Sequence, residues 1–161
     1  MFPDDLTILA VRVRDAFTAQ GLWLATAESC TGGLIAGCVT SVPGSSAMMD
    51  RGFVTYTNDA KSDMLGVPPA ILIEQGAVSG TVARLMVMGV LSRTRADVAL
   101  SVTGIAGPGG GTSAKPVGLV YLGAARRGRH PLVERHIFPG DRTAIRLASV
   151  KRALELALTV L

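Results

Sequence analysis

Apolar and polar positions along the chain follow two periods. Apolar residues three or four positions apart, bounded by capping residues and glycines, are typical of helices that cover a core. This spacing predicts helices over 4–20, 31–40, 58–65, 69–74, 79–94 and 140–161, with a short turn over 45–49 and Asn58 or Asp59 as the cap of the third helix. Apolar runs between them predict strands over 22–27, 51–57, 97–103, 117–125 and 132–138. Strands and helices alternate and a hairpin follows, so we expect one α/β domain over 1–161, a three-layer α/β/α sandwich with a mixed β-sheet.

Composition narrows the class of ligand. Apolar residues make up 48% of the chain and aromatic residues only 4%, so we expect a core of mainly aliphatic side chains. The 16 Lys and Arg outnumber the 12 Asp and Glu, which gives a net charge of +4 and suits a small anionic ligand. The densest basic cluster, 126–130, lacks interleaved aromatic residues that would stack on bases. It is interpreted as a turn between two strands, and we expect no nucleic-acid partner.

Cysteine and histidine usage points to a reduced protein without a metal. Cys30 and Cys38 would lie about 12 Å apart along one helix, too far for a disulfide. We therefore expect a cytoplasmic location. The acidic start of the chain is not typical of a signal peptide, and no apolar run is long enough to cross a membrane. His130 and His136 have no cluster of ligating side chains beside them in the sequence, so we expect no metal site.

The segment 27–33, AESCTGG, carries the first candidate chemistry. It follows an apolar run and precedes a predicted helix, so Ser29 and Cys30 would stand at a helix N-terminus. Free backbone N–H groups there can hold an anion or an oxyanion. A different interpretation makes Ser29 or Thr31 only a helix cap and Cys30 a small buried hydrophobic residue. Only one of the adjacent Ser29 and Cys30 can face a substrate carbonyl, and both are candidates.

Further polar residues follow the ends of other predicted strands. Tyr56 ends one strand and Lys61 lies in the first turn of the next helix. Because ligands of open α/β sheets bind at the carboxyl ends of strands, we expect both to meet Ser29 and the glycine-rich loop after Thr103. A lysine with a lowered pKa can serve as the base for a serine, directly or through a tyrosine hydroxyl. Arg142, at the start of the last helix, suits a phosphate. The ordinary alternatives are a surface lysine, a packed tyrosine, a mobile loop and a surface arginine.

Taken together, these residues resemble a known family, the C-terminal domain of the competence/damage-inducible CinA proteins, also found as a stand-alone nicotinamide-nucleotide amidohydrolase. The resemblance lies in eight segments in order: 27–33 (AESCTGG), 43–46 (PGSS), 51–58 (RGFVTYTN), 60–61 (AK), 76–79 (GAVS), 102–108 (VTGIAGP), 115–118 (KPVG) and 140–142 (GDR). Each segment alone is weak, whereas their order along most of the chain is specific.

The resemblance implies an enzyme that hydrolyses the carboxamide of nicotinamide mononucleotide to nicotinate mononucleotide and ammonia. It implies Ser29 as the nucleophile and Tyr56 and Lys61 as the proton-handling pair. Nine residues are expected at the substrate: Cys30, Thr31, Gly32, Gly33, Ser46, Thr103, Gly104, Gly107 and Arg142. The family also implies a homo-oligomer, no metal and no organic cofactor. We expect an amidase without the second domain of the bifunctional relatives.

Three other functions remain open from the sequence. The same fold can bind a phosphorylated nucleotide without catalysis, as a sensor or accessory module. The substrate can be another pyridine nucleotide or a small amide. The basic isoelectric point and the family's competence label also leave a nucleic-acid accessory, which would bind DNA with a steep salt dependence. The presence of all three expected catalytic residues favours the enzyme.

Overall fold

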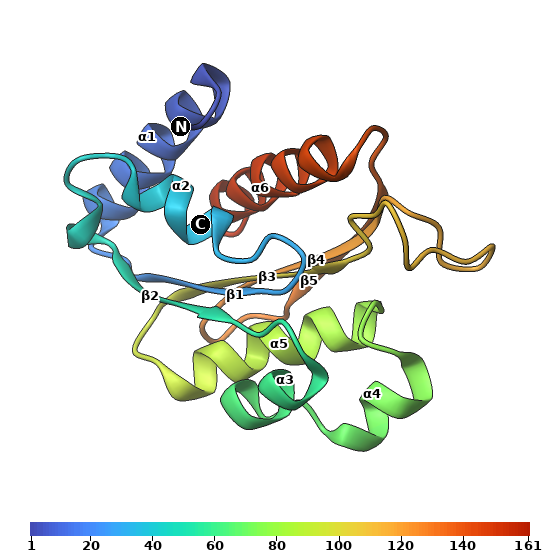
Figure 1. The fold of residues 1–161 in the computed structure, drawn as a ribbon. Coiled ribbons are helices and arrows are strands. Elements are labelled where there is room, and N and C mark those ends of the chain that lie inside the picture. The colour runs from blue at the N-terminus through green and yellow to red at the C-terminus, as the bar shows by residue number, and fades with distance from the viewer.

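One five-stranded sheet separates two layers of helices (Figure 1). The computed structural model describes residues 1–161. In chain order the strands are β1 (Leu24–Glu28), β2 (Met49–Val54), β3 (Val98–Gly104), β4 (Leu119–Arg126) and β5 (Leu132–Ile137). Their order across the sheet is β2-β1-β3-β4-β5. Strand β1 runs parallel to β2 and β3, whereas β4 is antiparallel to β3 and β5, which confirms the mixed sheet.

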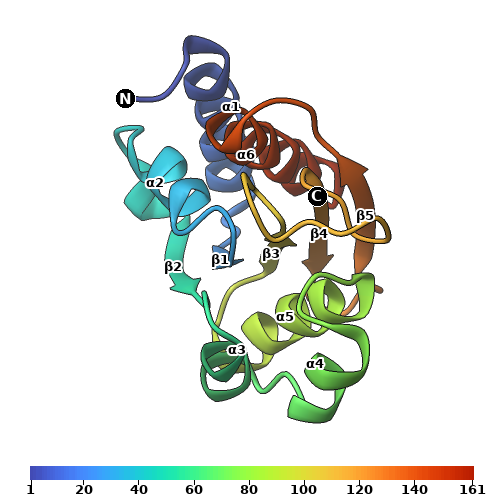
Figure 2. The same ribbon diagram turned by 45° about the vertical axis from the view of Figure 1, so that its right-hand side comes forward.

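The helices divide evenly between the two faces of the sheet (Figures 1 and 2). One face carries α1 (Asp4–Gln20), α2 (Leu34–Thr40) and α6 (Arg142–Thr159), and the other carries α3 (Asn58–Leu65), α4 (Pro69–Gln75) and α5 (Gly80–Arg93). A short 3₁₀ helix, η1 (Ser45–Ala47), joins α2 to β2. The three-layer α/β/α architecture is therefore confirmed. None of these helices is both long and apolar enough to cross a membrane.

Each face of the sheet has its own apolar core. The helical spacing of apolar residues on α1 buries Leu6, Leu9, Val13 and Phe17. They join a core of 25 buried residues beneath α1, α2 and α6, and a smaller core of 12 lies beneath α3, α4 and α5. Burial on both faces explains why the central strand β3 is a nearly continuous apolar run, whereas the edge strand β2 carries polar residues and is only partly buried. Both cores are mainly aliphatic, as the composition predicts.

Helix starts differ from the sequence predictions at two places near the strand ends. Helix α2 begins at Leu34 rather than at 31, because residues 29–33 form a turn that ends on Gly33 with φ +97. Such a backbone conformation is costly for residues other than glycine. Helix α3 is capped by Thr57, whose hydroxyl accepts a hydrogen bond from the Ala60 N–H at 3.0 Å, and not by Asn58 or Asp59. The Thr57 cap places Lys61 in the first turn of α3.

The three parallel strands end at one edge of the sheet. In the register of the sheet, Glu28 of β1 lies beside Val54 of β2 and Val102 of β3. The turn after β1, the turn after β2 and the loop after β3 therefore start side by side. This edge is where the predicted site residues are expected to meet.

Candidate active site

Seven of the predicted site residues line one pocket at this edge, with a volume of about 260 Å³. They come from the ends of β1, β2 and β3, from α3 and from the start of α6: Ser29, Cys30, Tyr56, Lys61, Thr103, Gly104 and Arg142. Asn58, Ala77, Val78 and Ala106 complete the lining. The pocket thus joins chain segments that are more than a hundred residues apart.

A buried lysine faces the candidate nucleophile. Nζ of Lys61 lies 3.1 Å from Oγ of Ser29, 2.9 Å from the Thr55 carbonyl oxygen and 3.5 Å from the Tyr56 carbonyl oxygen. Lys61 is 1% exposed and Ser29 is 9% exposed. Lys61 has no carboxylate among its hydrogen-bond or ion-pair partners. It is therefore not the surface lysine of the alternative interpretation.

Burial shifts Lys61 toward the neutral amine. Burial lowers the pKa of Lys61 below its ordinary value, because the ammonium form loses its hydration there. A neutral amine has two N–H donors and one lone pair. The two carbonyl oxygens can take the donors, which leaves the lone pair to accept the hydroxyl proton of Ser29. This arrangement can activate a serine.

Cys30 lacks such activation. Its side chain belongs to the larger core and is 6% exposed. Burial raises the pKa of the Cys30 thiol to about 11, so the thiol stays protonated at neutral pH. Because the thiolate is the nucleophilic form of cysteine, the burial and the raised pKa of Cys30 favour Ser29 as the nucleophile candidate.

Glu28 occupies the start of α2. Its carboxylate is fully buried and accepts hydrogen bonds from the backbone N–H groups of Gly33 at 3.1 Å, Ile35 at 3.0 Å and Ala36 at 2.9 Å. The expectation of a free anion site at Gly33 is therefore wrong, since a negative side chain of the chain itself already satisfies these donors. The interpretation of Ser29 or Thr31 as the cap of this helix is wrong for the same reason.

Two backbone donors of the turn remain without an acceptor. The Gly32 N–H donates to the Ser29 carbonyl and the Ser29 N–H donates to the Val102 carbonyl, both at 3.0 Å. The N–H groups of Cys30 and Thr31 have no hydrogen-bond partner within the chain. These two, rather than all the N–H groups from Cys30 to Gly33, are the unpaired donors of the turn, and of the two residues only Cys30 lines the pocket, whereas Thr31 is fully buried.

Tyr56 approaches Lys61 through its backbone and not through its hydroxyl. The side chain is 58% exposed, and its hydroxyl accepts a hydrogen bond from the Arg142 guanidinium at 3.1 Å. The same guanidinium donates to the Gly107 carbonyl at 2.9 Å. Arg142 therefore links the turn after β2 to the glycine-rich loop at the mouth of the pocket. Gly107 reaches the site through this contact.

Thr103 and Gly104 form the wall that β3 contributes. The Thr103 hydroxyl donates to the Ala77 carbonyl at 2.8 Å, which joins the end of β3 to the segment before α5. Gly104 packs so closely on β4 that a Cβ atom would lie 2.7 Å from the Val120 side chain and 2.8 Å from the Leu119 carbonyl. A side chain at this position would displace the strand and with it the pocket wall.

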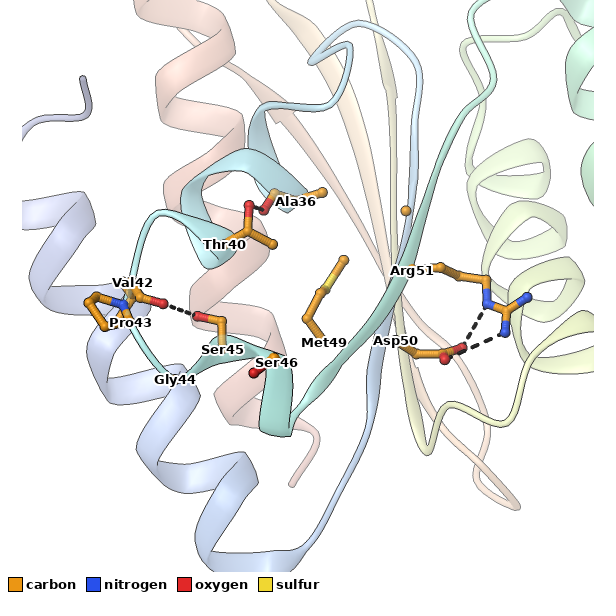
Figure 3. Close-up of a pocket in the computed structure, with 11 residues that line it drawn as sticks. Ala36, Thr40, Val42, Pro43, Gly44, Ser45, Ser46, Met49, Asp50 and Arg51 are labelled. Atoms are coloured by element: carbon orange, nitrogen blue, oxygen red, sulfur yellow. Dashed lines mark hydrogen bonds and ion pairs between the residues drawn. The ribbon is translucent and has the colours of Figure 1, made fainter.

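Ser46 lies elsewhere. It lines a separate pocket of about 540 Å³ between the end of α2, η1 and β2 (Figure 3). Its labelled neighbours there include Thr40, Met49 and Asp50. Thr31, Gly32 and Gly33 belong to the turn over 29–33 but do not line the pocket that holds Ser29. The structure thus does not bring Ser46 to Ser29, and it leaves 31–33 outside the lining of the pocket that holds Ser29.

The sequence interpretation missed Glu28 and Arg146 as parts of the site. An acidic residue shortly before a helix start is a signal for capping, and Glu28 stands within the AESCTGG segment. Arg146 follows Arg142 by four residues, so both lie on one face of α6. Its guanidinium donates to the carbonyl oxygens of Cys30 at 3.1 Å and Thr31 at 2.9 Å.

The fold and this pocket define an α/β/α domain with a serine and a buried lysine at the carboxyl ends of its parallel strands. The family model of the CinA C-terminal domain matches residues 6–161. The chain belongs to the CinA C-terminal domain family.

Relatives with curated names and solved structures agree with this membership. The chain is 50% identical over 150 residues to the nicotinamide-nucleotide amidohydrolase PncC of Enterobacter agglomerans, covering 93% of this chain and 92% of the relative. It is 44% identical to the PncC of Escherichia coli K12, covering 96% and 94%. A crystal structure of the competence/damage inducible protein CihA from Agrobacterium tumefaciens superposes with a TM-score of 0.97 at 54% identity, covering 99% of this chain and 97% of that one.

Some relatives are longer. The chain is 49% identical to a putative competence-damage inducible protein of Caldicellulosiruptor bescii but spans 37% of that protein's length. The two relatives named as amidohydrolases, in contrast, match over 92% and 94% of their own length. These two amidohydrolases are therefore the relatives that bear on the function of the chain.

Proposed function

We propose that the chain is a nicotinamide-nucleotide amidohydrolase that converts nicotinamide mononucleotide and water to nicotinate mononucleotide and ammonia. The observation that carries the proposal is the 3.1 Å approach of the buried Lys61 amine to Ser29 Oγ. The two PncC relatives, which match over most of this chain, bear the corresponding name. The whole chain, 1–161, would act as one amidohydrolase domain.

In the acylation step, the neutral Lys61 amine takes the proton of the Ser29 hydroxyl. The Ser29 oxygen attacks the carboxamide carbon, and the carbonyl oxygen becomes an oxyanion. The unpaired N–H group of Cys30, a residue that lines the pocket, is the donor available to it, and one such donor is worth about 3 kcal/mol. The Lys61 ammonium then returns the proton to the amide nitrogen, ammonia leaves, and an ester to Ser29 remains.

In the deacylation step, water attacks the ester carbon and Lys61 takes the proton of that water. The carbon–Oγ bond breaks, the proton returns to Ser29, and nicotinate mononucleotide is released. We assign proton transfer to Lys61 directly, since the Tyr56 hydroxyl bonds Arg142. Tyr56 as a relay, the other route considered from the sequence, would require its side chain to leave that contact.

Substrate phosphate is assigned to Arg142. Two of its nitrogens engage the Gly107 carbonyl and the Tyr56 hydroxyl, and a guanidinium has five N–H donors in a planar fork. The donors left can bind phosphate oxygens at the open side of the pocket. Thr103 and Gly104 would then border the pyridine ring from the β3 side. Ser46 has no place in this arrangement within one chain.

The remaining expectations concern the environment of the enzyme. Two free buried cysteines, Cys30 and Cys38, support the expected reducing, cytoplasmic location. The expected homo-oligomer stays a prediction, which light scattering on the purified protein checks. The chain is expected to need neither metal nor organic cofactor.

Ammonia release on adding nicotinamide mononucleotide to purified, chelator-treated protein tests the proposal. Release with nicotinate mononucleotide as the co-product, in equal amounts, is the expected result. Tight binding of the mononucleotide without ammonia release would overturn the enzyme and support a nucleotide-binding module. Release from nicotinamide alone at the same efficiency would contradict the assignment of phosphate recognition to Arg142.

A further inference from the structure

Arg146 contacts the turn over 29–33, called the nucleophile turn here because it carries Ser29, from the side opposite to Lys61. It comes from α6, which covers one face of the sheet, whereas Lys61 comes from α3 on the other face (Figure 1). Its Nε and one terminal nitrogen donate to the carbonyl oxygens of Cys30 and Thr31 at 3.1 and 2.9 Å. The Cys30 carbonyl has no other hydrogen-bond donor in the chain.

Because the peptide between Cys30 and Thr31 is planar, the contact of Arg146 with the Cys30 carbonyl also fixes the direction of the Thr31 N–H. In a trans peptide the carbonyl and the following N–H point in opposite directions. The only cis peptide bond of the chain is Gly107–Pro108. With the Cys30 carbonyl directed at Arg146, the Thr31 N–H points away from that guanidinium. That N–H is one of the two unpaired donors of the turn.

Gly32 and Glu28 hold the remaining backbone of the turn beside the Arg146 guanidinium. Gly32 has φ +58, and a Cβ atom there would lie 3.4 Å from the Arg146 terminal nitrogen. Glu28 holds the far end of the turn by the N–H groups of Gly33, Ile35 and Ala36. Carbonyls are thus held by a cation and N–H groups by an anion, so that the backbone on either side of Cys30 and Thr31 is fixed.

We propose that Arg146 is a positioning residue of the amidohydrolase, which orients the Cys30–Thr31 peptide and so holds the Ser29 oxygen and the Cys30 N–H in the reactive arrangement. It touches no reacting atom. The inference rests on the proposed function for its effect on turnover, but its effect on the reactivity of Ser29 does not require the natural substrate.

The matched variants are Arg146→Ala and Arg152→Ala. Both arginines lie on α6 and both are partly buried, but Arg152 pairs with Glu134 and Glu155 and does not contact the turn. Two readouts are measured for each. One is kcat and KM with nicotinamide mononucleotide, and the other is the rate at which a fluorophosphonate labels Ser29, followed by mass spectrometry.

Arg146→Ala is expected to lower kcat and the labelling rate together by roughly 100-fold, the cost of a misplacement of about 1 Å, with KM unchanged. Guanidinium ion at millimolar, non-denaturing concentration should restore both, because it can reoccupy the space between the two carbonyls. Arg146→Lys should recover only part of the activity, since one ammonium lacks the planar fork. Arg152→Ala should leave both readouts near wild type.

Three results would overturn the inference. The first is a labelling rate of Arg146→Ala equal to that of the wild type, and the second is an equal loss of kcat and labelling rate in Arg152→Ala. The third is no recovery of Arg146→Ala with guanidinium ion. Together these results separate positioning from general destabilisation. A wild-type protein that is labelled at Ser29 but releases no ammonia would refute the proposed function and leave the labelling comparison as the test of Arg146. A wild-type Ser29 that is not labelled would overturn the inference as well.

Discussion

Lys61 reaches Ser29 from a different layer of the fold. The two residues are 32 positions apart in sequence, yet Nζ and Oγ lie 3.1 Å from each other. Ser29 follows β1 and Lys61 lies in the first turn of α3, after β2. Because β1 and β2 are parallel neighbours, the segments that follow them emerge at one edge. The chemistry proposed for this chain depends on that single contact.

Replacement of the two adjacent candidates separates their roles. Ser29→Ala is expected to lower kcat by more than about 10⁴-fold, because the nucleophile is removed. Cys30→Ala is expected to lower kcat by less than about tenfold, because the protonated thiol only packs in the core and the backbone N–H is kept. Steady-state ammonia release measures both. The opposite order of effects would assign the nucleophile to Cys30.

The activity should rise with pH on its acid side. Lys61 acts as a base only when neutral, and burial lowers its pKa, so kcat/KM increases as pH rises through this lowered pKa and then levels off. Lys61→Arg should be inactive over the whole range, since a guanidinium stays protonated. Lys151→Met, a change at an exposed lysine on α6, serves as the control and should keep the wild-type profile. A pH-independent rate in the wild type would exclude Lys61 as the base.

The titration of Lys61 should also affect how the free energy of unfolding depends on pH. The folded pKa of Lys61 lies below that of the unfolded chain, so between the two values the unfolded state binds more protons and stability rises with pH. Lys61→Met lacks this titration, and other groups cancel in the difference between the two proteins. The stability of the wild type relative to Lys61→Met should thus be lowest below the folded pKa and increase toward the ordinary lysine pKa. Urea unfolding at a series of pH values measures it, and a difference that changes in the opposite direction would mean a raised pKa.

Tyr56→Phe distinguishes the two proton routes. Direct transfer by Lys61 predicts a fall in kcat of less than about tenfold, because the variant loses only the hydrogen bond between the hydroxyl and Arg142. Transfer through the tyrosine hydroxyl predicts a fall of about 10²- to 10⁴-fold. Rates are compared at the pH of the wild-type plateau, with circular dichroism as the check on folding.

Glu28→Gln should destabilise the fold by about 1–3 kcal/mol, because its amide nitrogen cannot accept and leaves a buried backbone N–H of α2 without a partner. Glu74→Gln, on the exposed face of α4, is the matched control and should change stability by less than about 0.5 kcal/mol. Urea unfolding of the three proteins measures the difference. Equal stability of Glu28→Gln and wild type would refute the capping role.

Most of the architecture follows from local patterns in the chain. The helical spacing of Leu6, Leu9, Val13 and Phe17 and the apolar runs of the strands are sufficient for the element order and for the mixed sheet. The strand-end rule also brought Ser29, Tyr56 and Lys61 to one edge. The errors fall where two segments compete for the same backbone groups. Ser29, Thr31 and Gly33 have the composition of a capping and anion-binding turn, but Glu28 satisfies the donors first.

Distances between segments that are far apart in the sequence depend on how the layers pack. Patterns of residue types a few positions apart do not predict these distances. Ser46 shares a family-like motif with its neighbours but lies in another pocket, because η1 follows α2 away from the strand ends. The Tyr56 hydroxyl bonds Arg142 because α6 returns to this edge 86 residues later in the chain.

The amino-acid sequence by itself determined the order of elements, the aliphatic core, the nucleophile segment and the family resemblance, since each depends on residue types a few positions apart. Only the tertiary structure decided that Lys61 is buried against Ser29, that Glu28 fills the start of α2 and that Arg146 holds the turn from the opposite face. The physical reason is that desolvation and hydrogen-bond competition arise when layers pack, so protonation and backbone orientation are properties of the assembled sheet and helices.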